Sequence, residues 1–298
     1  TDRSHRHSKA LEAELLSDPQ AKAEAEARNG LRQYDYGINV IHQALERGTF
    51  KLRPSLILAL QREALADISA YAGNFRPAGV EIVGSKHKPA EAHMVPELVE
   101  DLCDYVNDNW NSKTAIHLAS YVMWRLNWVH PFADGNGRTS RILSYVVLSI
   151  RAESIFPGTP TIPEQIVDNR NPYFDALDAA DAAWAGGRID LSKMEELLSG
   201  MLARQLANAY EGQAANCRRS VIGRVGDCAD PALHFERLAR ICPAFHTLRP
   251  LALVLLVLLS ACASERPVPP EPVARPAVEA PEPLDPAIRP LSQEEETL

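Results

Sequence analysis

The stretch HPFADGNGRTSR at residues 130–141 constrains the fold of this chain more than any other feature of its sequence. Apolar residues at spacings of three and four predict a helix over residues 113–129, and the helical period resumes at Ile142. A helix–loop–helix unit is therefore expected around the stretch. Neither core packing nor turn formation requires a histidine, a carboxylate, two glycines and two arginines in one short connection, so the loop needs a chemical explanation.

The second half of the stretch is suited to binding a polyphosphate. Gly135, Asn136 and Gly137 stand at the start of the second helix, where unpaired N–H groups and the positive end of the helix dipole attract anions. The glycines also let a phosphate approach the backbone closely. Arg138 and Arg141 are three residues apart and can point to one side of the first turn. Two guanidinium groups in that position suit phosphate oxygens.

The first half of the stretch supplies a base and a metal ligand. His130 titrates near neutrality and can accept a proton from a hydroxyl. Asp134 can bind Mg²⁺, which takes one or two carboxylates together with phosphate oxygens. Phe132 is expected to pack into the core and to fix the loop. Each fragment alone is typical of a turn or a solvated surface, and it is their order that favours a functional site.

The chain up to about residue 212 is predicted to be mostly α-helical. Its abundance of Ala, Leu, Glu and Arg favours helices over sheets. Besides the two helices around the motif, helical patterns cover residues 9–29 with a restart at Asp18-Pro19, 38–47, 54–71, 96–110, 171–184 and 190–210. Gly30 and Gly37 are expected to separate the pattern at residues 9–29 from the one at residues 38–47. A strand signal at residues 80–84 predicts one short β-hairpin.

Charge and cysteine content limit the class of protein. The formal net charge of −8 argues against binding of nucleic acid over the whole surface. Five scattered cysteines do not form a disulfide framework, and Cys103 is expected to be a small buried hydrophobic residue. Nothing near the first residue has the apolar core of a signal peptide, so the expected location is cytoplasmic.

The chain changes character after about residue 212, and we expect a poorly ordered tail. Residues 251–263 carry no charge but are short for a membrane span, which needs about 20 apolar residues. This run ends near Cys262 like a bacterial lipoprotein signal, although its position in the chain is wrong for one. Residues 265–290 are crowded with Pro and Glu and are typical of an extended segment. A fused or read-through segment is favoured over a short helix packed on the body, and a membrane anchor is favoured least.

Several potential zinc ligands lie in the tail and just before it. Their spacings match no common zinc finger, so a metal site is not expected there. They are Cys217, Cys228, His234, Cys242 and His246.

The motif resembles that of the Fic (Fido) domain family, His-Pro-Phe-x-(Asp/Glu)-Gly-Asn-Gly-Arg-x-x-Arg, at every specified position. The resemblance extends from about Leu11 to Tyr210 and implies a helical bundle with one β-hairpin flap. It divides the chain into an N-terminal helical region at residues 1–74, a Fic catalytic core with trailing helices at residues 75–212, and an atypical tail at residues 213–298.

The resemblance implies an enzyme that transfers AMP from ATP to a Ser, Thr or Tyr hydroxyl of a target protein and releases pyrophosphate. His130 would deprotonate the hydroxyl, and Asp134 would hold the Mg²⁺ that bridges the α- and β-phosphates. The remaining motif residues would form the anion hole and bind the outer phosphates: Gly135, Asn136 with its side chain, Gly137, Arg138 and Arg141. This division of labour agrees with phosphoryl-type transfer, which depends mainly on positioning and charge stabilisation.

Two alternatives to this function stay open. The same fold could use another nucleotide donor, or could remove AMP from a modified protein, because the base pocket is not readable from the sequence. A module that binds a nucleotide or a partner without catalysis is the second alternative. A broken motif would favour that module, and the motif here is complete.

The predicted flap would select the acceptor hydroxyl. Its edge strand, formed by Val80, Glu81, Ile82, Val83 and Gly84, could pair with an extended segment of the target by backbone hydrogen bonds. A hairpin that only covers the core is the alternative. The expected partner is thus a protein substrate, and self-modification and a homodimer are compatible with the resemblance.

Two further residues are considered for nucleotide binding and for regulation. Tyr173 could contact the adenine, although a core tyrosine on an amphipathic helix fits equally well. Many relatives restrain the second arginine of the motif with a glutamate from the pattern Ser/Thr-x-x-x-Glu-Gly/Asn. Ser192 and Glu196 have this spacing, but Leu197 replaces the small last residue, and Glu26 lacks a Ser or Thr four residues earlier. We take as a hypothesis that Glu196 restrains Arg141.

Overall fold

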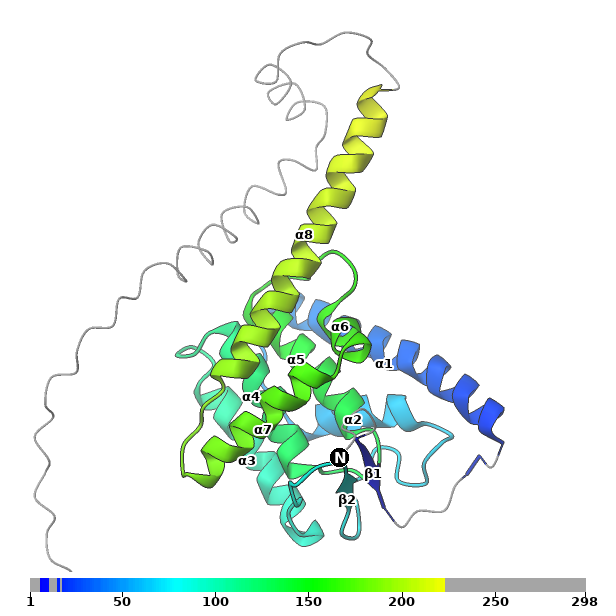
Figure 1. Ribbon diagram of the computed structural model, residues 1–298, viewed down its shortest axis with the longest axis vertical. Coiled ribbons are helices and arrows are strands. Elements are labelled where there is room, and N and C mark those ends of the chain that lie inside the picture. Colours follow the sequence, from blue (N-terminus) through cyan, green and yellow to red (C-terminus); the bar gives the residue numbers. More distant parts are fainter. Residues whose placement is uncertain (1–5, 11–14, 17, 223–298) are drawn as a thin grey trace, which may run out of the picture. The chain divides into compact units, whose positions relative to one another are not determined.

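The computed structural model describes residues 6–10, 15, 16 and 18–222 of the chain, and these residues are mostly helical, as expected (Figure 1). They contain eight α-helices, one 3₁₀ helix and two short strands. In chain order these are β1 (His7–Lys9), α1 (Pro19–Arg47), α2 (Pro54–Leu65), β2 (Glu81–Val83), η1 (Ala92–Met94), α3 (Val95–Asp108), α4 (Ala115–Val129), α5 (Asn136–Arg151), α6 (Ile162–Asp168), α7 (Asn171–Ala185) and α8 (Ser192–Ile222).

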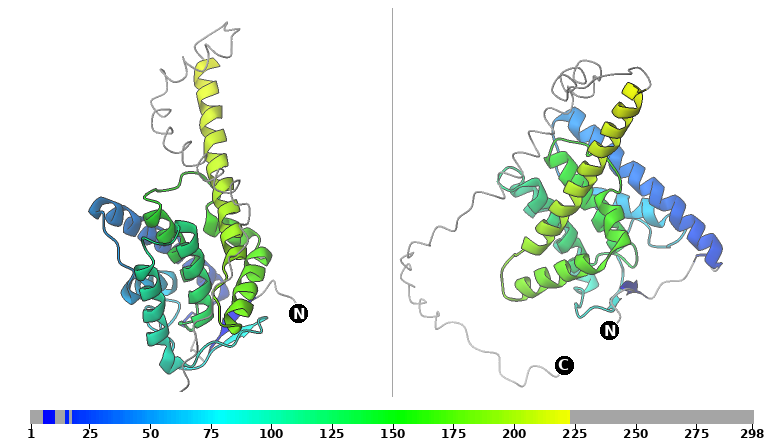
Figure 2. Two further views of the ribbon diagram at one scale, coloured as in Figure 1. Left: turned by 90° about the vertical axis from the view of Figure 1, so that its left-hand side faces the viewer. Right: turned by 45° about the horizontal axis from the view of Figure 1, so that its top comes forward.

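Helices α4 and α5 form the centre of the bundle, and the motif is the loop between them (Figure 2). α4 is buried on nearly all sides rather than along one stripe, because α3, α5, α7 and α8 all pack against it. α1 and α2 pack on each other and on α5. Trp124, Phe132 and Tyr145 are among the largest fully buried side chains, which confirms that Phe132 anchors the motif loop. The loop therefore connects two largely buried helices.

Helix α1 runs without interruption through both glycines that were expected to break it. Asp18 caps its start by accepting a hydrogen bond of 3.0 Å from the Ala21 amide, and Gly48 ends it in the left-handed conformation. A Cβ at Gly37 would lie 3.0 Å from Cγ1 of Ile142, so the missing side chain lets α1 approach α5 closely. Gly37 thus serves helix packing, which a reading of local propensity cannot detect.

Strand β2 does not belong to a local hairpin among the described residues. It pairs antiparallel with β1, and Ser8 lies opposite Ile82 in the register. A segment from the beginning of the chain therefore supplies the second strand, which the polar sequence of residues 7–9 gave no reason to expect. Helix α2 is also shorter than predicted, because the chain turns away after Leu65.

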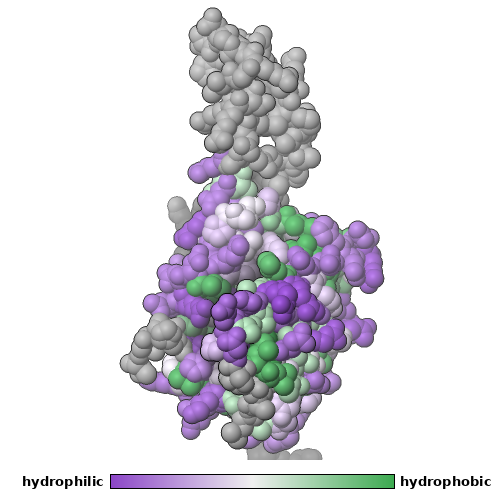
Figure 3. Space-filling model, turned by 90° about the vertical axis from the view of Figure 1, so that its right-hand side faces the viewer, coloured by the Kyte–Doolittle hydropathy of each residue, from purple (hydrophilic) through white to green (hydrophobic). Residues whose placement is uncertain are grey.

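The surface and the far end of the chain add two points. Hydrophilic side chains predominate on the face drawn in Figure 3, with hydrophobic ones scattered between them. Within the described part of the chain, no helix has both the length and the apolar character needed to cross a membrane. The apolar run at residues 251–263, the Pro-rich segment and the potential zinc ligands from Cys228 onward lie outside the described residues.

Candidate active site

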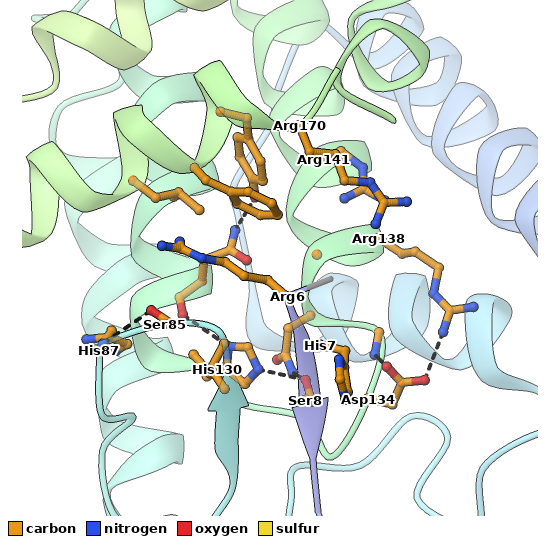
Figure 4. A pocket seen from close by; sticks show the side chains of 18 of the residues that line it. Arg6, His7, Ser8, Ser85, His87, His130, Asp134, Arg138, Arg141 and Arg170 are labelled. Atoms are coloured by element: carbon orange, nitrogen blue, oxygen red, sulfur yellow. Dashed lines mark hydrogen bonds and ion pairs between the residues drawn. The ribbon is translucent and has the colours of Figure 1, made fainter. Parts of the chain in front are cut away.

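A pocket of about 760 Å³ lies where the α4–α5 loop, strand β1, the flap strand β2, α1 and α7 meet (Figure 4). This volume is within the range of small-molecule sites. All of His130, Asp134, Gly135–Gly137, Arg138 and Arg141 line it, so the structure brings the complete motif around one cavity.

His130 is held as a neutral base at the end of α4. It adopts a left-handed backbone conformation, with φ 53°, and caps the helix through a hydrogen bond of 2.9 Å from its amide to the Leu126 carbonyl. Its side-chain Nδ1 lies 3.2 Å from the Asn127 carbonyl, which can only accept, so Nδ1 carries the proton and Nε2 is an acceptor. Burial lowers the pKa of His130 to about 4, against the opposing effect of the Asn127 carbonyl. The imidazole is therefore neutral at physiological pH and can take a proton through Nε2.

A buried arginine that the sequence reading did not identify fixes the backbone of this histidine. Arg76 is 3% exposed, and its Nε donates a hydrogen bond of 2.8 Å to the His130 carbonyl. Its other guanidinium nitrogens donate to the carbonyls of Ala78, at 2.8 Å, and Ala90, while its amide bonds the Pro131 carbonyl at 2.9 Å. Arg76 thus joins the motif loop to both ends of the segment at residues 78–90, which contains β2. A lone arginine in the sequence FRPAG gives no signal of this role.

The Asn136 side chain closes the motif loop internally. Its Oδ1 accepts a hydrogen bond of 2.9 Å from the Phe132 amide, and its Nδ2 donates one of 2.8 Å to the Phe132 carbonyl. The expected contact of this side chain with phosphate stays a prediction. Asn136 fixes the loop against the first turn of α5.

The first turn of α5 is left open toward the pocket. Gly135 caps the helix in the left-handed conformation, with φ 81°, and provides no side-chain cap for the first-turn amides. A Cβ at Gly135 would lie 2.5 Å from Cδ2 of Leu65, so glycine is required both by conformation and by space. Uncapped amides at a helix N-terminus beside a pocket are suited to an anion.

The arginines of the pocket differ in their ion pairs. Arg138 pairs with Asp134 at 2.9 Å and lies 3.8 Å from Glu26 on α1. Arg141 and Arg170 have no carboxylate partner among the described residues. Burial lowers the pKa of Arg141, and the charges of Arg170 and Arg138 lower it further, against the effect of Tyr173. A half-buried guanidinium next to other cations is suited to an anionic ligand. The sequence reading did not identify Arg170, which lies just before α7.

Tyr173 has the core position that was one of its two alternatives, whereas Glu196 does not line the pocket. Tyr173 lines the pocket but is 2% exposed, and its hydroxyl accepts a hydrogen bond of 2.9 Å from Asn127, so its ring belongs mainly to the core. Glu196 is exposed on α8 and does not line the pocket that contains Arg141. The proposed restraint of Arg141 by Glu196 is therefore not seen in the described part of the chain. Glu26 reaches the pocket instead, next to Arg138.

Asp134 is the residue that could hold a divalent cation. Its side chain is 49% exposed, with Oδ2 paired to Arg138 and Oδ1 accepting a hydrogen bond of 2.6 Å from the Gly135 amide. No group of three or more potential metal ligands occurs among the residues that the structure describes. One accessible carboxylate beside an anion site fits Mg²⁺, which takes its remaining ligands from phosphate oxygens and water.

Comparisons with known proteins find relatives of part of this chain. Residues 51–148 match the model of the Fic/DOC family. The chain is 32% identical over 127 residues to protein adenylyltransferase fic-1 of Caenorhabditis elegans, which covers 42% of this chain and 23% of the relative. It is 28% identical over 195 residues to protein adenylyltransferase Fic of Aedes aegypti, which covers 59% of this chain and 36% of the relative. The chain thus spans only a minor part of the length of these curated relatives.

Solved structures show the same fold. A structure of Fic-1 from C. elegans superposes with a TM-score of 0.53 at 20% identity, covering 67% of this chain and 55% of that one. A Fic domain-containing signaling protein from Bacteroides thetaiotaomicron superposes with a TM-score of 0.50 at 23% identity, covering 60% and 70%. The motif and the two helices that flank it thus lie largely within residues 51–148, the part of the chain that matches the model of the Fic/DOC family.

Proposed function

We propose that this protein transfers AMP from ATP to the hydroxyl of a protein Ser, Thr or Tyr residue and releases pyrophosphate. One observation carries this proposal. The Ser8 hydroxyl lies 2.8 Å from Nε2 of a neutral His130, beside the uncapped N-terminus of α5. The relatives named protein adenylyltransferase support the same reaction.

In this reaction Nε2 of His130 removes the hydroxyl proton while the hydroxyl oxygen attacks the α-phosphorus of ATP. The bond from that phosphorus to the oxygen of the β-phosphate breaks, and pyrophosphate leaves with the electron pair. The first-turn amides of α5 face the negative charge that builds on the α-phosphate, and Arg141 and Arg170 face that on the leaving group. Mg²⁺ held by Asp134 would add positive charge between the phosphates, for which Arg138 would have to release Asp134 in part.

The edge of β2 would position the acceptor. An extended segment that pairs with residues 81–83 presents alternate side chains to the pocket, so backbone pairing alone can place a hydroxyl beside His130. We retain residues 75–212 as the catalytic core of this proposal. Helix α2 contributes to the site as well, because Leu65 packs against the Gly135 position and Gln61 donates to the Asp134 carbonyl at 3.3 Å.

The test is incubation of the purified protein and a cell lysate with ATP labelled either at the α- or at the γ-phosphate. We expect protein-bound label from the α-phosphate only, and its loss in His130→Ala. His87→Ala is the matched control, because His87 also lines the pocket but bonds the Trp128 carbonyl at 2.7 Å. Transfer of the γ-label would indicate a kinase, and binding of ATP without any transfer would indicate a binding module.

The same assay separates the remaining alternatives. Labelling from α-labelled GTP, CTP or UTP in preference to ATP would reassign the donor. Release of AMP from a modified protein, without transfer in the forward direction, would indicate the removal reaction.

A further inference from the structure

The beginning of the chain occupies the edge of the flap strand. We call residues 6–9 the N-terminal arm. Strand β1 of this arm pairs antiparallel with β2, with His7 opposite Val83, Ser8 opposite Ile82 and Lys9 opposite Glu81. This is the edge along which an acceptor segment would pair in the proposed function.

Ser8 of the arm lies at the position of an acceptor hydroxyl (Figure 4). Its Oγ is 2.8 Å from Nε2 of His130. Because Nδ1 of His130 carries its proton toward the Asn127 carbonyl, Nε2 accepts, and Ser8 is the donor of this hydrogen bond. Nδ2 of Asn136, at the start of α5, lies 3.4 Å from the same oxygen. The hydroxyl is therefore directed at the base and placed beside the predicted phosphate site.

Several contacts of the Arg6 side chain fix the register of the arm. The Arg6 side chain is 9% exposed and forms two hydrogen bonds with the Asp178 carboxylate on α7, of 2.9 and 2.8 Å. Its guanidinium carbon lies 4.7 Å from the centre of the Phe174 ring, and its Nε donates to the Gly84 carbonyl at 3.3 Å. These contacts hold the side chain two residues before Ser8 in place. They therefore fix which residue of the arm lies next to His130.

We propose that Ser8 is an acceptor of AMP within its own chain. The proposal rests on the function proposed above and names the substrate of the same site. The Ser8 Oγ–H bond breaks as Nε2 of His130 takes the proton, and Oγ forms a bond to the α-phosphorus of ATP. The bond between this phosphorus and the bridging oxygen of the β-phosphate breaks, giving a Ser8–AMP phosphodiester and pyrophosphate.

Pairing of the arm with β2 also governs access to the flap edge. While β1 pairs with β2, another chain cannot pair with the same edge. Removal of the arm is therefore a condition for modification of any other protein by backbone pairing with β2.

The experiment maps the modified residue by mass spectrometry after incubation of the full chain with ATP and Mg²⁺. We expect one AMP on the peptide that contains Ser8 in the wild type. The modification persists in Ser8→Thr, which retains a hydroxyl, and is lost in Ser8→Ala and in His130→Ala. Ser112→Ala, an exposed serine outside the pocket, is the matched control and keeps full modification of Ser8.

A second arm of the experiment separates this proposal from the proposed function. Ser8→Ala is expected to transfer AMP to lysate proteins at least as fast as the wild type, because its site is intact. An unmodified Ser8 peptide in a wild-type sample that labels lysate proteins overturns the assignment of Ser8 and leaves the proposed function in place; so does AMP on another residue of the chain. Absence of label on both the chain and the lysate overturns the proposed function and the Ser8 assignment together.

Dilution tests whether the reaction is intramolecular. The fraction of Ser8 modified per unit time is expected to stay constant when the protein is diluted over about two orders of magnitude, because an intramolecular acceptor has a fixed effective concentration. A rate that falls in proportion to protein concentration would show transfer between copies and would overturn the intramolecular proposal.

Discussion

The guanidinium of Arg76 donates a hydrogen bond of 2.8 Å to the backbone carbonyl of His130 and so fixes the backbone of this residue. The same side chain bonds two carbonyls of the flap segment, at Ala78 and Ala90. The position of His130 and the position of the segment that contains β2 therefore both depend on the buried side chain of Arg76. A residue outside the motif thus contributes to the geometry of the site.

Replacement of Arg76 should affect both stability and the properties of His130. A lysine cannot reproduce three divergent hydrogen bonds, so Arg76→Lys is expected to lower the free energy of unfolding by about 2 kcal/mol. The charge of Arg76 also lowers the pKa of His130, and a displaced cation should let that pKa rise. Denaturant unfolding and NMR titration of the His130 ring measure the two effects.

Arg151→Lys provides the control for this prediction. Arg151 donates from Nε to the Trp110 carbonyl at 2.6 Å and does not line the pocket. Its replacement should lower stability but leave the titration of His130 unchanged. Equal titration curves for Arg76→Lys and Arg151→Lys would contradict a positioning role of Arg76.

The order of residues in the motif predicted the side of the pocket that the α4–α5 loop forms, and the limits of that prediction have physical causes. Helix periodicity and a glycine-rich helix start are local signals, so the α4–α5 loop and its chemistry were readable from residues 130–141. Ser8 reaches His130 from a polar segment with no strand signal, far away in sequence. Arg76 and Arg170 are single residues whose roles arise from tertiary contacts.

The wrong prediction of helix breaks at two glycines has a related cause. Glycine at positions 30 and 37 predicted breaks in the helix, yet α1 continues through both residues. Packing of α1 on α5 outweighs the loss of helix propensity, which is about 1 kcal/mol per glycine. Glu196 matched a sequence spacing, whereas Glu26 matched the spatial requirement for a carboxylate near the pocket arginines. Spacing along the chain does not determine which helix faces the site.

Gly135→Ala and Gly30→Ala are expected to change stability in opposite directions. At Gly135 a Cβ would meet Leu65 at 2.5 Å with φ at 81°, so alanine should lower the free energy of unfolding by about 2 kcal/mol and disturb the anion site. At Gly30 no atom lies within 4 Å of the added Cβ. Alanine there should stabilise α1 by about 0.5–1 kcal/mol. Urea denaturation of both variants tests the prediction, and a neutral effect of Gly135→Ala would contradict it.

We expect Arg141 to lower the free energy of unfolding of the protein and to increase its affinity for ATP. The half-buried guanidinium of Arg141 has no carboxylate partner in the described part of the chain, so Arg141→Met is expected to raise the free energy of unfolding by about 1 kcal/mol. Arg138→Met, which removes the partner of Asp134, should instead lower it slightly, by below about 1 kcal/mol. Both variants should weaken ATP binding about tenfold. Calorimetry with and without ATP distinguishes these effects, and a destabilised Arg141→Met would contradict the role assigned to it.

Burial of neutral His130 should make the protein less stable in mild acid. Its pKa is about 4 in the folded protein and about 6.5 when unfolded, so the unfolded state binds the proton more readily between these values. Stability contributed by the neutral ring is complete above pH ~6.5 and is lost as the pH falls toward ~4, by on the order of 3 kcal/mol. The difference in unfolding free energy between wild type and His130→Asn, measured from pH 7 to 4.5, isolates this loss. A constant difference over that range would mean that the folded histidine titrates normally.

Arg6 should control the rate at which Ser8 is modified without controlling catalysis. Its paired hydrogen bonds to Asp178 and its contact with Phe174 hold the arm, so Arg6→Ala is expected to slow AMP transfer to Ser8 by about tenfold. Lys9→Ala, on an exposed position of the same strand, should change this rate by less than about twofold. Transfer to other proteins should not fall in Arg6→Ala, because a released arm frees the edge of β2. If Ser8 is modified at the wild-type rate without Arg6, the arm is held by strand pairing alone.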